Sequence, residues 1–364
     1  MSVATLAQKR IAIIQTNANL DLATEITKNL SARIGREHDY VKIPTTEAQF
    51  ANTETNIILR ESVRGRDVYI ITTGAAPVND NLMALFLLVD ACKRSSAHSV
   101  NVVMPAYPYS RSDKRDHRGP IGSAMTASLL ERLGVDRLIS CDIHSGQIQG
   151  FFQKAFDNLY CKNILIDKVR EITEALLYKN GTAAKISDMF LLCSPDAGGL
   201  KRIKAWAASL GINYCSMDKQ RDYTQMNMVL RSRFIGDPNE VKDKYILIVD
   251  DIADTLGTMM SSVRELQELG AAGIFIIITH GYFSGEAIPR VNSNDFIKGV
   301  VCTDSLPQTE NIVKCPKLHV ASLAPLLSEV IWRIQSAYDI GAIEGITETS
   351  TSLSQLFTVD TPLP

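Results

Sequence analysis

The stretch from Tyr245 to Thr258 joins an apolar run to a short loop that is rich in acids and hydroxyls. Residues 245–249 carry no charge, as expected of a buried strand, and a segment of helical period begins near Thr258. A helix N-terminus offers free N–H groups and the positive end of the helix dipole, so this loop can surround a phosphate. The 5-phosphate of a sugar fits such a site. The residues expected to line it are Asp250, Asp251, Asp254, Thr255, Leu256, Gly257 and Thr258.

The acids of this loop need a partner of opposite charge. Asp250 and Asp251 are adjacent and would repel each other beside a phosphate, unless ribose hydroxyls or a magnesium ion neutralise them. A structural alternative is that Asp250 and Asp254 only cap the following helix. Capping needs one such residue, so the density of acids and hydroxyls favours a binding loop.

A second candidate is the charged loop at residues 107–120, which reads YPYSRSDKRDHRGP. Its basic side chains, among them Arg111, follow an apolar run and are flanked by prolines and a glycine. Such a loop is typical of a mobile lid that closes on a polyphosphate and excludes water. The alternative for a charged run of this kind is a solvated surface loop.

Two further turns follow expected strands. His144 lies two residues after Asp142, where a histidine can ligate a metal or contact triphosphate oxygens, although a lone histidine is more often structural. Asp196 lies in the run SPDAGG, whose glycines permit close approach of the backbone while the carboxylate holds magnesium or ribose hydroxyls. The alternative for the SPDAGG run is a generic tight turn.

The elements that must position these groups alternate between short apolar runs and segments of helical period, which predicts an α/β fold with mainly parallel sheets flanked by helices. In such sheets ligands bind beyond the carboxyl ends of the strands. The predicted strands are residues 10–16, 67–73, 101–106, 137–142, 189–193, 245–250, 274–279 and 299–302. The predicted helices are residues 22–34, 79–95, 123–133, 199–210, 258–269 and 323–337. The glycines that follow them, as C-terminal caps do, are Gly35, Gly134, Gly211 and Gly270.

Length and composition bound the remaining possibilities. With 364 residues the chain is long enough for two domains, which we place at residues 1–160 and 161–345, followed by a tail at 346–364 that packs back on the first domain. The net charge of -2 gives no general reason to expect nucleic acid or a membrane as a partner. The seven scattered cysteines and the lack of an apolar stretch of about 20 residues predict a cytoplasmic protein with reduced thiols.

The run VDDIADTLGT at residues 249–258 resembles the phosphoribosyl-diphosphate binding loop of the type I phosphoribosyltransferases and the ribose-phosphate pyrophosphokinases. The runs PYSRSDK, DIHSGQIQGFF and SPDAGG are similar to motifs of the pyrophosphokinases of class I, and the resemblance extends from about Arg10 to Leu356. It implies two phosphoribosyltransferase-like domains with the site between them. It also implies a homo-oligomer, either a hexamer or another assembly built from dimers.

The resemblance further implies a reaction and its participants. The β,γ-diphosphoryl group of Mg-ATP is transferred to the C1 hydroxyl of ribose 5-phosphate, with Mg²⁺ as the cofactor. Asp196 joins the loop at residues 250–258 in binding ribose 5-phosphate, and Lys219, Arg221 and Arg111 act in catalysis. His144 and Asp196 contact the metal. The residues implied for ATP are Phe50, Asn52, Glu54, Arg111, Ser112 and His144, of which the first three are lent by a neighbouring subunit.

Some positions depart from the family pattern. In the run Asp218-Lys219-Gln220-Arg221 the lysine and arginine are present, while a preceding histidine and an intervening glutamate are replaced. Ser112 stands where glutamine is common, and Met125 stands where lysine is common. These changes touch ATP contacts or subunit packing, and no general base is evident.

A regulatory anion site is also implied by the resemblance. Positions that bind phosphate or ADP in regulated members are matched by Ser62, Arg64, Gln149, Ser352 and Ser354. Arginine and small hydroxyls suit phosphate. A surface turn and an unattached tail are the equally simple alternative.

Two other functions compete with the pyrophosphokinase interpretation. A non-catalytic regulatory subunit of the same family would keep the fold, but such proteins tend to lose loop acids or lid basic residues, and Asp250, Asp254, Arg111 and Lys219 are all present here. A phosphoribosyltransferase would need only about half this length and neither the SPDAGG turn nor the PYSRSDK loop.

Overall fold

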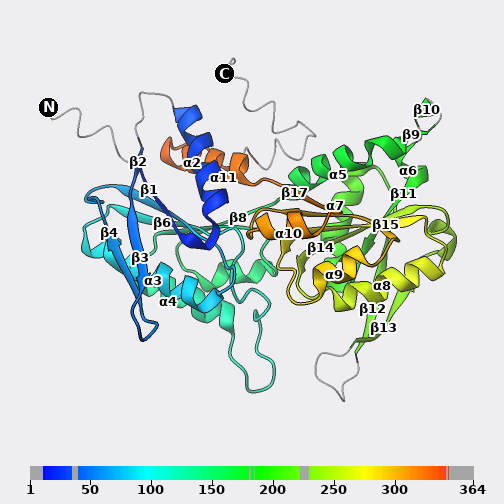
Figure 1. Cartoon of the computed structure of the whole chain (residues 1–364), viewed down its shortest axis with the longest axis horizontal. Helices are drawn as coiled ribbons and strands as arrows, with labels where there is room; N and C mark the ends of the chain where they lie inside the picture. The colour runs from blue at the N-terminus through cyan, green and yellow to red at the C-terminus, as the bar shows by residue number, and fades with distance from the viewer. Residues whose placement is uncertain are drawn as a thin grey trace. The chain divides into compact units, whose positions relative to one another are not determined.

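The computed structural model describes residues 11–34, 40–179, 182–183, 185–221, 229–341 and 343. The chain forms two compact units (Figure 1). The first holds the chain up to Cys161, Ser305–Pro307 and the stretch that begins at Ser322, and the second holds Lys162–Asp304 and Gln308–Ala321. The expected second domain ran without interruption from 161 to 345, so the return of the chain from Ser322 to the first unit corrects that boundary.

The first unit is built on a 6-stranded sheet of order β2-β1-β5-β6-β7-β8. All neighbouring strands are parallel. A separate antiparallel hairpin, β3–β4, accompanies the sheet. The strands are β1 Ile11–Gln15, β2 Val41–Lys42, β3 Thr45–Gln49, β4 Thr55–Leu59, β5 Asp67–Ile71, β6 Ser99–Val103, β7 Arg137–Cys141 and β8 Ala155–Leu159.

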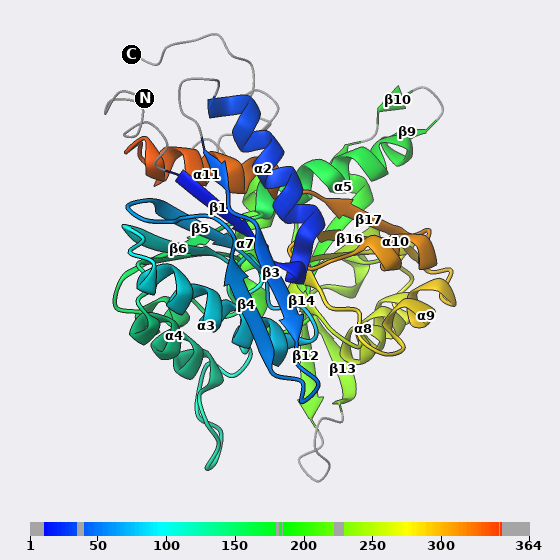
Figure 2. The ribbon, with the colours of Figure 1, turned by 60° about the vertical axis from the view of Figure 1, so that its left-hand side comes forward.

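Helices cover both faces of this sheet, as its buried strands require. Apolar residues of α3 and α4, among them Leu88 and Leu130, form one core cluster with the strands. Helices α2 and α11 pack against each other (Figure 2), where the buried Glu329 carboxylate bonds Arg33 at 2.7 Å and Arg333 at 2.6 Å. The helices are η1 Asn17–Asn19, α2 Leu20–Ile34, α3 Val78–Arg94, α4 Gly122–Leu133, η2 Gly146–Phe151 and α11 Ala324–Gln335.

The second unit contains a 7-stranded sheet of order β13-β12-β11-β14-β15-β16-β17. Only the β12–β13 pair is antiparallel among these described strands. A short hairpin, β9–β10, lies apart from it. The strands are β9 Tyr178–Lys179, β10 Thr182–Ala183, β11 Phe190–Ser194, β12 Tyr214–Arg221, β13 Val229–Ile235, β14 Tyr245–Ala253, β15 Gly273–Gly281, β16 Ile297–Thr303 and β17 Leu318–Ala321.

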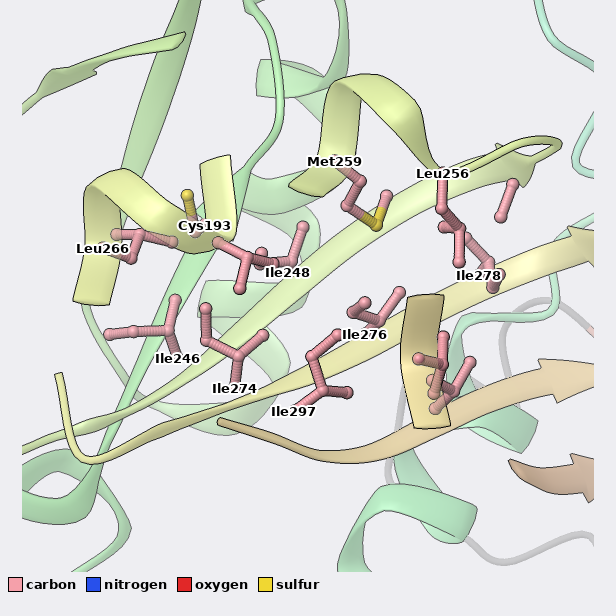
Figure 3. Close-up of a cluster of buried hydrophobic side chains, with 14 of the residues drawn as sticks. Cys193, Ile246, Ile248, Leu256, Met259, Leu266, Ile274, Ile276, Ile278 and Ile297 are labelled. Carbon is pink, nitrogen blue, oxygen red and sulfur yellow. The ribbon is translucent and has the colours of Figure 1, made fainter. Parts of the chain in front are cut away.

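One face of this sheet packs against α8 and α9. Figure 3 shows Met259 and Leu266 of α8 beside Ile248 and Ile276 of the central strands, and all four belong to one buried cluster. The spacing of seven residues between Met259 and Leu266 places both on one face of the helix. The helices are α5 Lys162–Leu177, α6 Ile186–Met189, η3 Ala197–Gly199, α7 Leu200–Leu210, η4 Pro238–Glu240, α8 Gly257–Glu268, α9 Ala287–Asn292 and α10 Thr309–Lys314.

The predicted α/β class is confirmed, and each predicted strand and helix coincides with one in the structure. Gly134, Gly211 and Gly270 adopt positive φ at or just after helix ends, as expected of caps, and Gly35 lies outside the described residues. The bounds of several elements differ by a few residues, and one difference affects the site. Strand β14 was predicted to end at Asp250 and continues to Ala253, so Asp251 also belongs to the strand.

Candidate active site

The order in which the chain adds strands to the second sheet reverses between β11 and β14. From β11 the chain adds β12 on one side, and it then adds β14, β15 and β16 in order on the other side. The two central strands β11 and β14 are parallel and directly paired, so their carboxyl ends lie side by side at this point. Ligands of open α/β sheets bind in the crevice that such a reversal creates.

The turn after β11 is tightly closed around Asp196. The Asp196 carboxylate accepts a hydrogen bond from the Gly199 N–H at 3.1 Å, and the buried Ser194 hydroxyl donates to the Asp196 carbonyl at 2.7 Å. A Cβ on Gly199 would lie 2.4 Å from the Ser194 oxygen. The glycine is therefore required by the close approach of Ser194. Asp196 itself is partly buried.

Asp250 and Asp251 at the end of β14 both contact the side chain of Arg202 in α7. The Arg202 guanidinium lies 3.2 Å from the Asp250 carboxylate and 3.3 Å from that of Asp251. Burial, the charge of Asp251 and a hydrogen bond with it raise the pKa of Asp250 to about 8, although Arg202 acts in the opposite direction. Asp196 adds to the repulsion. Negative charge is thus concentrated here beyond what one arginine neutralises.

The loop that joins β14 to α8 has a strained residue at its tip. Leu256 precedes the first helical residue, Gly257, with φ 59° and ψ 5°, a left-handed conformation that is uncommon for a branched side chain. Its buried side chain joins the core cluster that α8 forms with the sheet. Leu256 makes no side-chain cap hydrogen bond to the first turn of α8, and the N–H groups of a first helical turn are those that an anion can use.

A neighbouring arginine contacts this loop from outside. The Arg290 guanidinium donates to the Thr255 carbonyl at 2.6 Å. Thr255 and Gly257 are exposed, while Thr258 and Asp254 are partly buried. All the residues of the predicted sugar-phosphate loop are therefore brought together at the same edge of the sheet as Asp196.

Lys219 and Arg221 lie near the carboxyl end of β12, the neighbour of β11. Their backbone pairs with β13, and the register shifts between Gln220 and Arg221. The structure describes the backbone of both residues, which places them at the edge of the sheet that carries Asp196.

In the first unit, the charged loop follows β6. Its ends are packed: Tyr107 is buried and donates to the Ser123 carbonyl at 2.9 Å, and the Ser112 hydroxyl accepts from the Gly122 N–H at 2.9 Å. Arg111 and most residues up to Pro120 are exposed. Ser112, which stands where the family has glutamine, thus holds the base of the loop against α4.

The turn after β7 separates a structural acid from an exposed histidine. Asp142 has φ 35° and its carboxylate accepts from the Cys161 N–H at 3.2 Å. His144 is exposed on the carboxyl side of β7, the strand that pairs with β6. Gln149 bonds the Gly146 carbonyl at 3.3 Å within η2. His144 and the charged loop therefore emerge from the same edge of the first sheet.

The residues expected to bind adenine form the tip of the β3–β4 hairpin. The Phe50 N–H donates to the Glu54 carbonyl at 2.9 Å, and Asn52 accepts from the Glu54 N–H at 3.2 Å. Phe50 is 56% exposed. The structure thus leaves Phe50 without a core role in this chain.

The predicted regulatory residues occupy separate places. Ser62 and Arg64 form an exposed turn after β4, in which the Ser62 oxygen accepts from the Arg64 N–H at 3.3 Å. Ser352 and Ser354 lie outside the described residues, as does the predicted tail from 346 onward. Met125 is 52% exposed on α4.

Three general properties bear on the site. In the described parts of the chain, no cluster of three or more His, Cys, Asp or Glu side chains is arranged to enclose a metal ion. Within the same ranges no helix is both long and apolar enough to cross a membrane. All seven cysteines are free and buried.

Sequence reasoning missed Arg202 and Arg290. Arg202 lies six residues after Asp196 in a helix that already follows a predicted binding turn, so its position in the first turn of α7 was the one available signal. Arg290 lies in α9, a short helix that the sequence analysis did not predict. Each arginine is distant from its partner in the sequence, and the two meet only because the sheet brings their elements together.

Comparisons with known proteins agree with this arrangement. Residues 11–134 match the model of the N-terminal domain of ribose phosphate pyrophosphokinase, and residues 232–343 match that of the phosphoribosyl synthetase-associated domain. The chain is 38% identical over 336 residues to ribose-phosphate pyrophosphokinase A of Dictyostelium discoideum, which covers 92% of this chain and 98% of that protein. The crystal structure of phosphoribosylpyrophosphate synthetase from Mycobacterium smegmatis superposes with a TM-score of 0.78 and 33% identity, covering 90% of this chain and all of that one.

The fold and the site define an α/β protein with a phosphate loop and clustered carboxylates at the reversal point of a mainly parallel sheet. The match to the relative covers 92% of this chain and 98% of the relative, so both units together correspond to one protein of this class. The chain belongs to the ribose-phosphate pyrophosphokinase family and is a transferase of that type. The predicted family resemblance is confirmed.

Proposed function

We propose that the protein is a ribose-phosphate diphosphokinase, which transfers the β,γ-diphosphoryl group of Mg-ATP to the C1 hydroxyl of ribose 5-phosphate and yields 5-phosphoribosyl 1-diphosphate and AMP. The observation that carries the proposal is the meeting of Asp196, Asp250 and the N-terminus of α8 at the carboxyl ends of β11 and β14. Ribose 5-phosphate needs both kinds of group in one site, because carboxylates accept hydrogen bonds from the sugar hydroxyls and backbone amides donate to the phosphate.

The sugar phosphate is proposed to bind in a fixed direction. The N–H groups at the start of α8 and the Thr255 and Thr258 hydroxyls take the 5-phosphate, because a helix N-terminus favours a dianion. Asp250 and Asp251 lie at the strand end just before this loop, and their carboxylates accept hydrogen bonds from the ribose hydroxyls. Arg202 keeps the two carboxylates oriented in this role.

The carboxylates fit a divalent cation. The raised pKa of Asp250 has burial as its main cause and the nearby Asp251 and Asp196 as further causes, so added positive charge is favourable here. Mg²⁺ is usually held by one or two carboxylates together with substrate oxygens and water, and does not need a cage of protein ligands. We assign Asp196 and His144 as its protein contacts. When bound, Mg²⁺ would neutralise charge on the phosphate oxygens.

ATP is proposed to bind through residues of the first unit. Arg111 and His144 emerge from neighbouring parallel strands and are exposed, so both can reach triphosphate oxygens, with Ser112 at the base of the same loop. Phe50 offers an exposed ring for stacking on adenine, with Asn52 and Glu54 beside it for its polar edge. Since such a hairpin tip serves a neighbouring subunit in the resembled proteins, we also propose a homo-oligomer.

The reaction needs position and charge more than covalent help from side chains. The oxygen on C1 forms a bond to the β-phosphorus as the bond from that phosphorus to the α,β-bridging oxygen breaks. The proton of the C1 hydroxyl leaves to solvent, and AMP carries the bridging oxygen away. Lys219, Arg221 and Arg111 are proposed to stabilise the negative charge that grows on these oxygens.

Two further proposals concern regulation and place of action. Ser62, Arg64 and Gln149 are proposed to bind phosphate or ADP together with Ser352 and Ser354, since the exposed Arg64 lies in a serine-containing turn suited to an anion. The free cysteines support a reducing compartment, and we propose the cytoplasm.

A direct assay tests the proposed reaction. Purified protein is mixed with ribose 5-phosphate, ATP and Mg²⁺, and AMP is followed by chromatography. We expect AMP and phosphoribosyl diphosphate in equal amounts, and loss of both when EDTA removes the metal. AMP at background level while ribose 5-phosphate still binds would favour the non-catalytic regulatory subunit, which the catalytic relative and the intact acids do not favour.

A further inference from the structure

Arg290 is fixed beside the sugar-phosphate loop by the protein core. It belongs to α9, whose Ala287, Ile288 and Val291 are buried in the same cluster as Leu256. From this anchored backbone its guanidinium donates to the Thr255 carbonyl at 2.6 Å. A Cβ on Gly257 would lie 3.6 Å from the same nitrogen, so the guanidinium lies along the start of α8.

Arg290 also lines a groove beside the start of α8. The groove has a volume of about 570 Å³ and lies between α8 and the chain from 290 to 296. A second arginine, Arg264, lines the groove from the same face of α8 as Gly257, about two turns further along the helix. Among the residues that the structure describes, the Arg264 guanidinium has no hydrogen bond or ion pair. The groove therefore holds two arginines of which only one is engaged with the loop.

The bond to Thr255 determines the direction of the next amide. In a planar trans peptide the C=O and the N–H point to opposite sides. A Thr255 carbonyl held on the Arg290 side consequently turns the Leu256 N–H to the other side of the loop. Leu256 itself has φ 59°, a conformation that a leucine keeps only when its surroundings determine it.

We propose that Arg290 is a positioning residue for ribose 5-phosphate. It holds the Thr255 carbonyl outward so that the Leu256 N–H and the amides that open α8 face the 5-phosphate, and it does so without touching the substrate. The inference rests on the proposed function, because it assumes that this loop binds the sugar phosphate. It adds a residue from outside the loop that prepares the loop for binding.

Calorimetric binding of ribose 5-phosphate in the presence of Mg²⁺ tests the inference. Arg290→Met should raise the dissociation constant for ribose 5-phosphate about tenfold, as expected from the loss of one charge-assisted hydrogen bond. Binding of Mg-ATP should not change. In steady-state kinetics the KM for ribose 5-phosphate should rise more than kcat falls. Arg290→Lys, which keeps a donor, should bind with an affinity between the two.

Matched controls separate positioning from charge and from folding. Arg264→Met removes the other arginine of the groove and should leave the affinity unchanged. The defect of Arg290→Met should persist at about 1 M salt, where the Debye length is about 3 Å, whereas a defect due only to the electric field of the guanidinium should vanish. Circular dichroism and the melting temperature check that each variant is folded.

The outcomes separate this inference from the proposed function. If the unsubstituted protein does not bind ribose 5-phosphate, the proposed function and the inference both fail. If it binds and Arg290→Met binds equally well, loses its defect in high salt, or weakens Mg-ATP to the same extent, only the inference is overturned. If Arg290→Met does not fold, Arg290→Lys replaces it in the test. An unchanged affinity of Arg290→Lys for ribose 5-phosphate at both salt concentrations would then overturn the inference.

Discussion

Asp250 is a carboxylic acid in a place that disfavours its ionised form. Its side chain is largely buried at the end of β14, and Asp251 is its immediate neighbour. Arg202 offsets part of this cost through contacts at 3.2 and 3.3 Å. Binding of a cation or of sugar hydroxyls would therefore favour the ionised form of Asp250. Perturbed acids of this kind are frequent at functional sites.

The raised pKa of Asp250 gives a pH dependence of stability. The folded protein holds the proton up to about pH 8, while an unfolded aspartate releases it near pH 4. This group thus stabilises the fold fully below pH 4, and the contribution is lost as pH rises through 8. Without metal or substrate, the free energy of unfolding should fall between pH 5 and 8, by at most about 1.4 kcal/mol per pH unit for one proton.

Urea titrations at several pH values measure this effect. Asp250→Asn should flatten the fall between pH 5 and 8, while Asp295→Asn, at a fully exposed carboxylate, should leave the slope as it is. Equal slopes for the unsubstituted protein and Asp250→Asn would show that Asp250 does not retain its proton.

Gly199 gives a second prediction at the scale of one residue. Gly199→Ala would place a methyl group 2.4 Å from the oxygen of Ser194, which is buried and bonded to the Asp196 carbonyl. Relief requires movement of the Asp196 turn, so we expect a loss of about 1–3 kcal/mol in stability and a lower kcat/KM for ribose 5-phosphate. Gly150→Ala is the control, because its Cβ meets open space. Unchanged kinetics for Gly199→Ala would contradict the assigned role of this turn.

At the scale of elements, strand ends and helix starts carry the chemistry. Strand β14 is followed by α8, and the reversal of the sheet at β11 places the Asp196 turn beside it. The hairpin β3–β4 is different, because its tip projects residues that contribute little to a core. Exposed aromatic residues at a hairpin tip are consistent with a binding function that is separate from stability.

Phe50 tests this separation. Phe50→Ala removes a ring that is 56% exposed, so the free energy of unfolding should change by less than about 0.5 kcal/mol. The KM for ATP should rise about tenfold if the ring stacks on adenine. Ile58→Ala, at an apolar residue of the same hairpin that is 41% exposed, serves as the control. A normal KM for ATP in the Phe50 variant would remove the adenine assignment.

At the scale of the whole molecule, each unit closes around its own core. The first unit is completed by α11, which follows the second sheet in the sequence and packs on α2. Glu329 is buried between Arg33 and Arg333, and the Arg33 guanidinium lies 4.3 Å from the centre of the Trp332 ring. Burial lowers the pKa of Arg33, although Glu329 acts against this shift. The return of the chain is thus held by a buried ionic group.

Breaking this group should destabilise the first unit selectively. Glu329→Gln leaves the buried arginines without a full counter-charge, and we expect a loss of about 3–5 kcal/mol. The protein has two tryptophans, Trp206 in the second unit and Trp332 in the first. With Trp206→Phe as background, fluorescence of Trp332 should show an earlier urea transition, while in a Trp332→Phe background Trp206 should report little change. Glu310→Gln, at an exposed ion pair, is the control.

Much of the fold and part of the site follow from local pattern. The near-continuous Ile and Val runs of β14 and β15 predict buried parallel strands, because strands covered on both faces exclude charge. The acids and hydroxyls after such a run predict a phosphate loop. The alternation of strands with helices was therefore sufficient for the fold class, and the motifs for the family resemblance. The edge hairpins and short helices such as α9 were not predicted, because few residues give them little periodicity. The 16-residue helix α5 and strand β12 were not predicted either, although both are long enough to carry a pattern.

The sequence by itself determined which residues stand at strand ends and which kind of chemistry they suit, since period and residue type are local properties of the chain. Only the tertiary structure decided that β11 pairs with β14, that Arg202 meets Asp250 across 48 residues, and that Arg290 meets Thr255 across 35. The order of strands depends on how whole faces of helices and sheets bury one another. The strand order therefore cannot be read from any short stretch of the sequence.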